Sequence, residues 1–212
     1  MADQILPVQQ PCSPTVIQKR DINIPGDGHT IVANANNVNT TMFVMQGAVQ
    51  VGMPGLFDGT FRPDYECYNL FVTDTDSFGD GWFYIRKEDA LTESTPPDIF
   101  SECCSLSEPA ILRIMSHPAI FASRNQLQGR KTRDDHYAYY GYVTSVDVLE
   151  DLIKVGCMLM NKVLQNTLID LSDDLGIEYA PYFCEFDRPH WAIKRVNLVD
   201  VLREAGYRVF TM

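Results

Sequence analysis

YYGYVTSVDVLEDLIKVGCMLM, residues 139–160, is the stretch of sequence that decides the fold. It contains two runs rich in β-branched, aromatic and apolar residues, 139–149 and 152–160, separated only by Glu150 and Asp151. A connection of two residues between strands is typical of a tight antiparallel hairpin. The stretch therefore predicts two long, neighbouring antiparallel strands.

Further strands are expected on both sides of this hairpin. Residues 42–51, 68–73, 82–85 and 191–193 have the same aromatic and β-branched character. Residues 207–210 are expected to return as a terminal strand.

Helices are predicted from capping residues and apolar spacing. Thr95 and Ser107 each precede proline and acidic residues, as helix N-caps often do, and Asn197 caps a closing helix that ends before Gly206. In residues 161–177, leucines recur at intervals of four, three and four, which predicts one amphipathic helix ending at Gly176.

The order of these elements predicts an α+β fold. We expect a mostly antiparallel sheet or partly open barrel with three to four packed helices, because strands outnumber helices and do not alternate with them regularly. Four prolines among the first 25 residues and an Asn-rich stretch after residue 30 predict an extended N-terminal arm. The chain is thus divided into an arm or docking segment, 1–41, and a single domain, 42–212.

Composition limits the classes of function. The 212 residues include 28 acidic and 17 basic ones, with a formal net charge of -11, which disfavours broad binding to duplex DNA. No leader peptide and no long apolar run is recognisable, so we expect a cytoplasmic protein that does not bind membranes. The six cysteines include no CxxC pair, which argues against structural zinc.

The loop 74–81 gathers three aspartates, Asp74, Asp76 and Asp80, and is a weak candidate for a metal site. It does not match a calcium-binding EF-hand loop, because Phe78 and Ile85 occupy positions that would need ligands. A hairpin loop that uses Asp and Gly for turn geometry is the preferred interpretation.

The strongest candidate for a binding site follows a stretch without acidic residues, 109–133. Arginine offers a fixed fork of donors to anions, and tyrosine offers a stacking face with a polar tip. We expect an exposed basic loop, 123–133, over a floor formed by the strand that begins near Tyr139, with a second rim at 188–191. In the alternative interpretation, the charges of the loop pair with surface carboxylates and Trp191 is a core anchor. The candidate ligand-binding residues are Arg124, Asn125, Arg130, Lys131, Arg133, His136, Tyr139, Arg188, His190 and Trp191.

These residues predict a non-catalytic intracellular regulatory or sensing module that binds an anionic, nucleotide-like small molecule or a protein partner. No cofactor is expected, since the common nucleotide, zinc-protease and hydrolase motifs are absent from the sequence. A phosphodiesterase or nuclease using His136 and His190, with Asp135 nearby, is one alternative. An acidic adaptor or inhibitor, whose Asn-rich arm and negative surface bind another protein, is another. Residues 30–41 are also a candidate segment for binding a protein partner or for self-association.

Overall fold

The computed structural model describes residues 62–74, 78–126, 132–180 and 182–212, and the backbone of two further strands. Those strands, β1 (Thr41–Met45) and β2 (Ala48–Gly52), pair antiparallel with each other. Apart from Thr41, the predicted arm 1–41 and its segment 30–41 lie outside the described residues. The extended arm, its role in self-association and the division after residue 41 therefore stay predictions.

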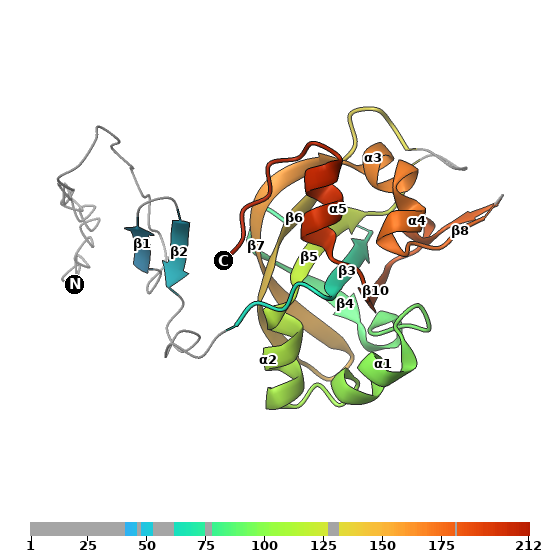
Figure 1. Ribbon diagram of the computed structural model, residues 1–212. Helices are drawn as coiled ribbons and strands as arrows, with labels where there is room; N and C mark the ends of the chain where they lie inside the picture. Colours follow the sequence, from blue (N-terminus) through green and yellow to red (C-terminus); the bar gives the residue numbers. More distant parts are fainter. Residues whose placement is uncertain (1–40, 46–47, 53–61, 75–77, 127–131, 181) are drawn as a thin grey trace, which may run out of the picture. The chain divides into compact units, whose positions relative to one another are not determined.

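A six-stranded sheet with the strand order β10-β3-β5-β6-β7-β4 forms the centre of the fold (Figure 1). Strands β3 and β5 run parallel, and every other neighbouring pair in this sheet is antiparallel. The predicted α+β class with a mostly antiparallel sheet is thus confirmed. The strands are β3 (Tyr68–Thr73), β4 (Trp82–Arg86), β5 (Pro118–Ser123), β6 (Tyr137–Val148), β7 (Leu152–Leu164) and β10 (His190–Lys194).

Helices cover both faces of this sheet (Figure 1). The helices are α1 (Pro97–Cys103), α2 (Glu108–Ser116), α3 (Gln165–Asp170), α4 (Ser172–Leu175) and α5 (Leu198–Glu204), with short 3-10 turns η1 (Lys87–Asp89) and η2 (Glu185–Asp187). Strands β8 (Tyr179–Ala180) and β9 (Phe183–Cys184) form a separate two-stranded ribbon. Asn197 caps α5 as expected, since its side chain accepts a hydrogen bond from the backbone N–H of Asp200.

The two faces of the sheet bury different side chains, because neighbouring residues of a strand point to opposite faces. One face carries the phenylalanine core, in which the Phe71 ring lies 5.4 Å from that of Phe121 and 5.0 Å from that of Trp191. Helices α1 and α2 cover this core. The other face carries the tyrosine core, which contains Tyr140 and Tyr142 and is covered by α3, α4 and α5.

The sheet curls over the phenylalanine core. Strand β4 is separated from β3 by three strands in the sheet order, yet the rings of Phe83 in β4 and Phe71 in β3 lie 5.3 Å apart. The long hairpin β6–β7 makes this possible, since its register shifts beside Tyr140 and again after Val143. Such bulges bend a strand and increase its twist.

The predicted hairpin is confirmed, and it is longer than expected. Leu149 donates its backbone N–H to the carbonyl of Leu152 at 2.9 Å, which closes the connection. At the first bulge the two backbones approach so closely that a Cβ on Gly141 would clash with the carbonyl oxygen of Met158. Glycine is therefore required at this position.

Four expectations about elements were wrong. Residues 118–123 form a central strand, β5, where a helix end and a loop were expected, and the loop 74–81 joins non-neighbouring strands instead of closing a hairpin. The helix expected over 161–177 is strand β7 as far as Leu164 and then two helices divided at Leu171. Residues 207–210 are irregular, because their carbonyls bond to side chains: Tyr140 donates to the Phe210 carbonyl.

Candidate functional site

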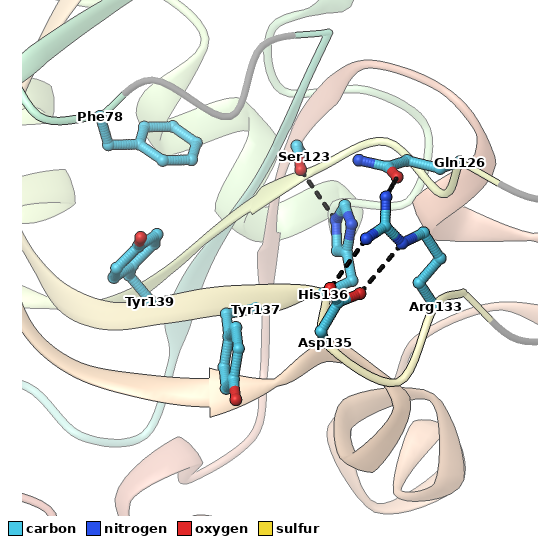
Figure 2. Close-up of a pocket in the computed structure, with 8 residues that line it drawn as sticks. All are labelled: Phe78, Ser123, Gln126, Arg133, Asp135, His136, Tyr137 and Tyr139. Atoms are coloured by element: carbon cyan, nitrogen blue, oxygen red, sulfur yellow. Dashed lines mark hydrogen bonds and ion pairs between the residues drawn. The ribbon is translucent and has the colours of Figure 1, made fainter.

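A pocket of about 240 Å³ opens beside the start of β6 (Figure 2). The end of β5 supplies its polar floor, and the turn before β6 and the loop after β5 supply its charged and amide side chains. Its lining residues are Phe78, Ser123, Gln126, Arg133, Asp135, His136, Tyr137 and Tyr139.

The buried end of the pocket is formed by Ser123 and His136. The Ser123 hydroxyl Oγ lies 2.8 Å from His136 Nε2, within hydrogen-bond distance, and both residues are buried. Strand pairing brings them together: Phe121 pairs with Tyr139, so the residues beyond these two approach each other at the same end of the sheet. A hydroxyl group and an imidazole thus share one hydrogen bond at the buried end of the pocket.

Buried amides support this pair from behind. Gln165 donates its side-chain N–H groups to the Ser123 carbonyl at 3.0 Å and to Asn125 Oδ1 at 2.9 Å. Asn125 in turn donates to Asp187 Oδ1 at 2.8 Å. The backbone N–H of Gln165 also donates to the His136 carbonyl at 3.0 Å. These bonds fix the backbone on both sides of the Ser123–His136 contact.

Aromatic rings line the opposite side of the pocket, where Figure 2 shows Phe78, Tyr139 and Tyr137 following one another away from the serine. The rings of Phe78 and Tyr139 lie 6.0 Å apart at an interplanar angle of 71°. The ammonium group of Lys162 lies 5.5 Å from the centre of the Tyr137 ring and 5.9 Å from that of Tyr139. A planar molecule would therefore meet both aromatic surface and a cation.

Charge in the pocket is partly compensated. Arg133 donates to Asp135 through two nitrogens, at 3.0 and 2.7 Å, and also contacts the Gln126 side-chain oxygen at 3.5 Å. The hydrogen bonds from Arg133 and its positive charge lower the pKa of the exposed Asp135 carboxyl. Arg133 is thus held in place by its partners. Lys162 is exposed on β7 and is not a lining residue, but its charge lies beside the rings of Tyr137 and Tyr139.

The structure brings four of the predicted site residues to the pocket wall: Arg133, His136 and Tyr139, with Asp135 from the catalytic alternative. Asn125 lies behind the wall, in the amide network. Within the described part of the loop 123–133, Ser123, Asn125 and Thr132 are buried, where exposure was expected. Arg124 is exposed and lies 3.5 Å from Asp74. Arg130 and Lys131 lie outside the described residues.

The expected second rim does not line this pocket. Trp191 is fully buried in the phenylalanine core and donates its ring N–H to Asn69, so the core-anchor alternative is correct. Arg188 forms an ion pair with Glu93. Strand β10, which contains His190 and Trp191, is buried along its whole length, and the sequence did not reveal this.

His190 belongs to a separate buried cluster. Its Nε2 lies 3.0 Å from Glu185 Oε1, and Lys194 donates to Glu185 Oε2 at 2.8 Å. Burial would raise the pKa of the Glu185 carboxyl, but the hydrogen bond with His190 and the charge of Lys194 outweigh it and lower this pKa to about 2. The cluster is a compensated interior ion pair.

The two histidines of the phosphodiesterase alternative have different hydrogen-bond partners. His136, just before β6, contacts Ser123, whereas His190, at the start of β10, contacts Glu185 and the Arg188 carbonyl. Only His136 is among the residues that line the pocket.

Four residues that line the pocket were not among the predicted candidates: Phe78, Ser123, Gln126 and Tyr137. Lys162, which lies beside two of the lining rings, was not predicted either. Lys162 is placed by its pairing with Tyr139 across β6 and β7. Ser123 is placed by β5, a strand that was not expected. Strand pairing places Ser123 and Lys162 beside the pocket, and the linear order of residues does not show this pairing.

The weak metal candidate gains no support from the described part of the chain. Asp74 and Asp80 are exposed, Asp76 lies outside the described residues, and no group of three or more potential ligands occurs among the residues that the structure describes. Within that same part, none of the helices has the length and apolarity to cross a membrane. Comparison with protein families, curated proteins and solved structures gives no match.

Proposed function

We propose that the protein binds a small planar molecule with one anionic group, of nucleotide type, in the pocket beside β6, and acts as a sensing module for it. The observation that carries this proposal is the pocket itself, in which aromatic rings and hydrogen-bonding side chains line one cavity. Ligand sites in proteins typically combine apolar walls with a few polar groups that fix orientation.

The size of the pocket limits the ligand. Its volume of about 240 Å³ lies below the range of roughly 300–1,000 Å³ that is usual for drug-sized ligands. One ring system with a short polar substituent suits this space better than a dinucleotide does.

The charges limit the ligand further. Arg133 is already paired with Asp135, so Lys162 is the cation that adds net positive charge beside the rings of Tyr137 and Tyr139. Among the described residues, one compensated cation and one additional cation favour a singly charged ligand over a polyphosphate. The ring would lie against the tyrosines, and the anionic group near Lys162 and Arg133.

Isothermal titration calorimetry tests this proposal with nucleosides, mononucleotides, cyclic mononucleotides and small aromatic carboxylates. Tyr137→Ala removes an exposed ring, so folding should persist while affinity falls by about two- to twelvefold, the equivalent of about 0.5–1.5 kcal/mol for an aromatic contact. Lys162→Ala should lower the affinity for anionic ligands and leave the affinity for uncharged nucleosides unchanged.

Tyr84→Ala is the matched control, because Tyr84 is equally exposed but belongs to β4 and does not line the pocket. It should bind as the unaltered protein does. If no member of the panel binds, or if Tyr84→Ala and Tyr137→Ala weaken binding equally, the pocket is not the site.

A further inference from the structure

The geometry points to an activity beyond binding: Ser123 acts as a nucleophile toward small aryl esters, with His136 as its general base. This inference rests on the proposed function, since the same aromatic walls must hold the aryl group. Its basis is the contact of 2.8 Å between Ser123 Oγ and His136 Nε2 at the buried end of an open pocket.

Burial and support distinguish this contact from a surface hydrogen bond. Both residues are more than nine-tenths buried, yet both line the cavity. A serine hydroxyl is a weak nucleophile unless a base within hydrogen-bond reach takes its proton, and this contact satisfies that distance. Gln165 holds the Ser123 carbonyl on one side and the His136 carbonyl on the other, which keeps the two side chains in register.

The reaction balances with water as the only co-reactant. In the reactive tautomer His136 carries its proton on Nδ1, and Nε2 accepts the hydroxyl proton while Ser123 Oγ bonds to the carbonyl carbon. The ester C–O bond then breaks, and the leaving phenol takes the proton from Nε2. Water attacks the acyl-serine, its proton passes through Nε2 to Ser123 Oγ, and the carboxylic acid leaves.

The remaining pocket residues suit this substrate class. The rings of Phe78, Tyr137 and Tyr139 offer surface to an aryl group, as Figure 2 shows. Arg133, paired with Asp135, lies on the pocket wall with the serine and histidine, so its positive charge would favour negative charge developing on the carbonyl oxygen. A small aryl ester of a short carboxylic acid matches the size of the cavity.

Two reagents test the inference on the full chain. An alkyl fluorophosphonate should add one phosphonyl group per molecule, with loss of fluoride, and peptide mapping should place it on Ser123. A p-nitrophenyl acetate assay should show a burst of about one nitrophenol per chain. His136→Gln should slow both reactions by about 100- to 10,000-fold, the usual contribution of a general base.

The controls separate chemistry from folding. Ser123→Ala should lose labelling while keeping its circular dichroism spectrum, and Ser123→Cys, which retains a nucleophile, should still be acylated by the ester. Ser101→Ala, on the exposed side of α1, should label at the unaltered rate. Labelling of a different residue, or equal labelling in Ser123→Ala, overturns the inference.

The outcome also separates this inference from the proposed function. Tight binding of a panel ligand without labelling shows that the Ser123–His136 contact is structural, and the inference fails while the binding proposal stands. If labelling and the nitrophenol burst occur but no nucleotide-like ligand binds, the activity is supported and the choice of ligand is refuted. Absence of both refutes both.

Discussion

Replacing Glu185 by glutamine tests the energetics of the buried ion cluster. The Glu185 carboxylate is fully buried and accepts hydrogen bonds from Lys194 Nζ at 2.8 Å and from the backbone N–H of Glu178 at 2.8 Å, while His190 Nε2 lies 3.0 Å away. Glutamine keeps the shape but removes the negative charge. The ammonium group of Lys194 is then left buried without a counter-charge.

The expected loss of stability can be obtained in two ways. Moving the Glu185 pKa from its ordinary 4.5 to about 2 corresponds to about 3 kcal/mol, at about 1.4 kcal/mol per pKa unit. Breaking a buried ion pair by removing one partner costs about 3–5 kcal/mol in general. We therefore expect Glu185→Gln to lower the free energy of unfolding at pH 7 by about 3 kcal/mol.

The pH dependence follows from the direction of the pKa change. A carboxyl whose pKa is lower in the folded state stabilises the fold fully above its unfolded pKa and loses this effect as the pH falls through the folded pKa. The difference between the unaltered protein and Glu185→Gln should therefore shrink between pH 5 and pH 2. With these values it falls by about 2 kcal/mol between pH 7 and pH 3.

Urea unfolding followed by tryptophan fluorescence at pH 7, 5 and 3 measures this difference directly, since Trp191 is buried in the native state. Glu204→Gln, which removes an exposed carboxylate from α5, is the matched control and should stay within about 0.5 kcal/mol of the unaltered protein. A loss below about 1 kcal/mol for Glu185→Gln, or a loss independent of pH, would refute the argument.

Three further substitutions test the fold, each by thermal and urea unfolding. Gly141→Ala should cost at least about 2 kcal/mol, because its Cβ would clash with the Met158 carbonyl, whereas Gly79→Ala has open space and should be nearly neutral; equal effects would contradict the close approach of the strands. Tyr140→Phe should cost about 1–2 kcal/mol, because its hydroxyl bonds to a second tyrosine and to a carbonyl of the C-terminal segment; an unchanged midpoint would show that these bonds contribute little. Asn197→Ala should cost about 1 kcal/mol through loss of the α5 cap, and recovery of most of that loss in Asn197→Ser would identify capping as the cause.

The sequence predicted the elements that local signals define. The hairpin 139–160 was predicted because both strands and their short connection are contiguous, and α5 because Asn197 and Gly206 mark its ends. Strand β5 was missed because its six buried residues, which begin with a proline, do not show the alternation of a half-exposed strand. The division at Leu171 was missed because its leucine spacing fits a continuous helix equally well.

The residues of the candidate site show the same difference between local and long-range signals. His136 and Tyr139, which were predicted, both line the pocket and lie within four residues of each other, in the turn before β6 and near its start. Ser123 and Phe78 reach the pocket through strand pairing and loop packing, which depend on residues distant in sequence. His190 does not line the pocket, and nothing in its neighbourhood in sequence showed that Glu185 and Lys194 would enclose it.

The hairpin β6–β7 contributes side chains to both cores, and this has a consequence for how the domain opens. Tyr142 lies in the tyrosine core, whereas Val155, on the partner strand, lies in the phenylalanine core. Opening one core while the hairpin stays packed in the other core would strain β6 and β7, because both cores share these strands. Amide hydrogens near the middle of both strands should therefore exchange with solvent only when the whole domain unfolds, with one common protection free energy.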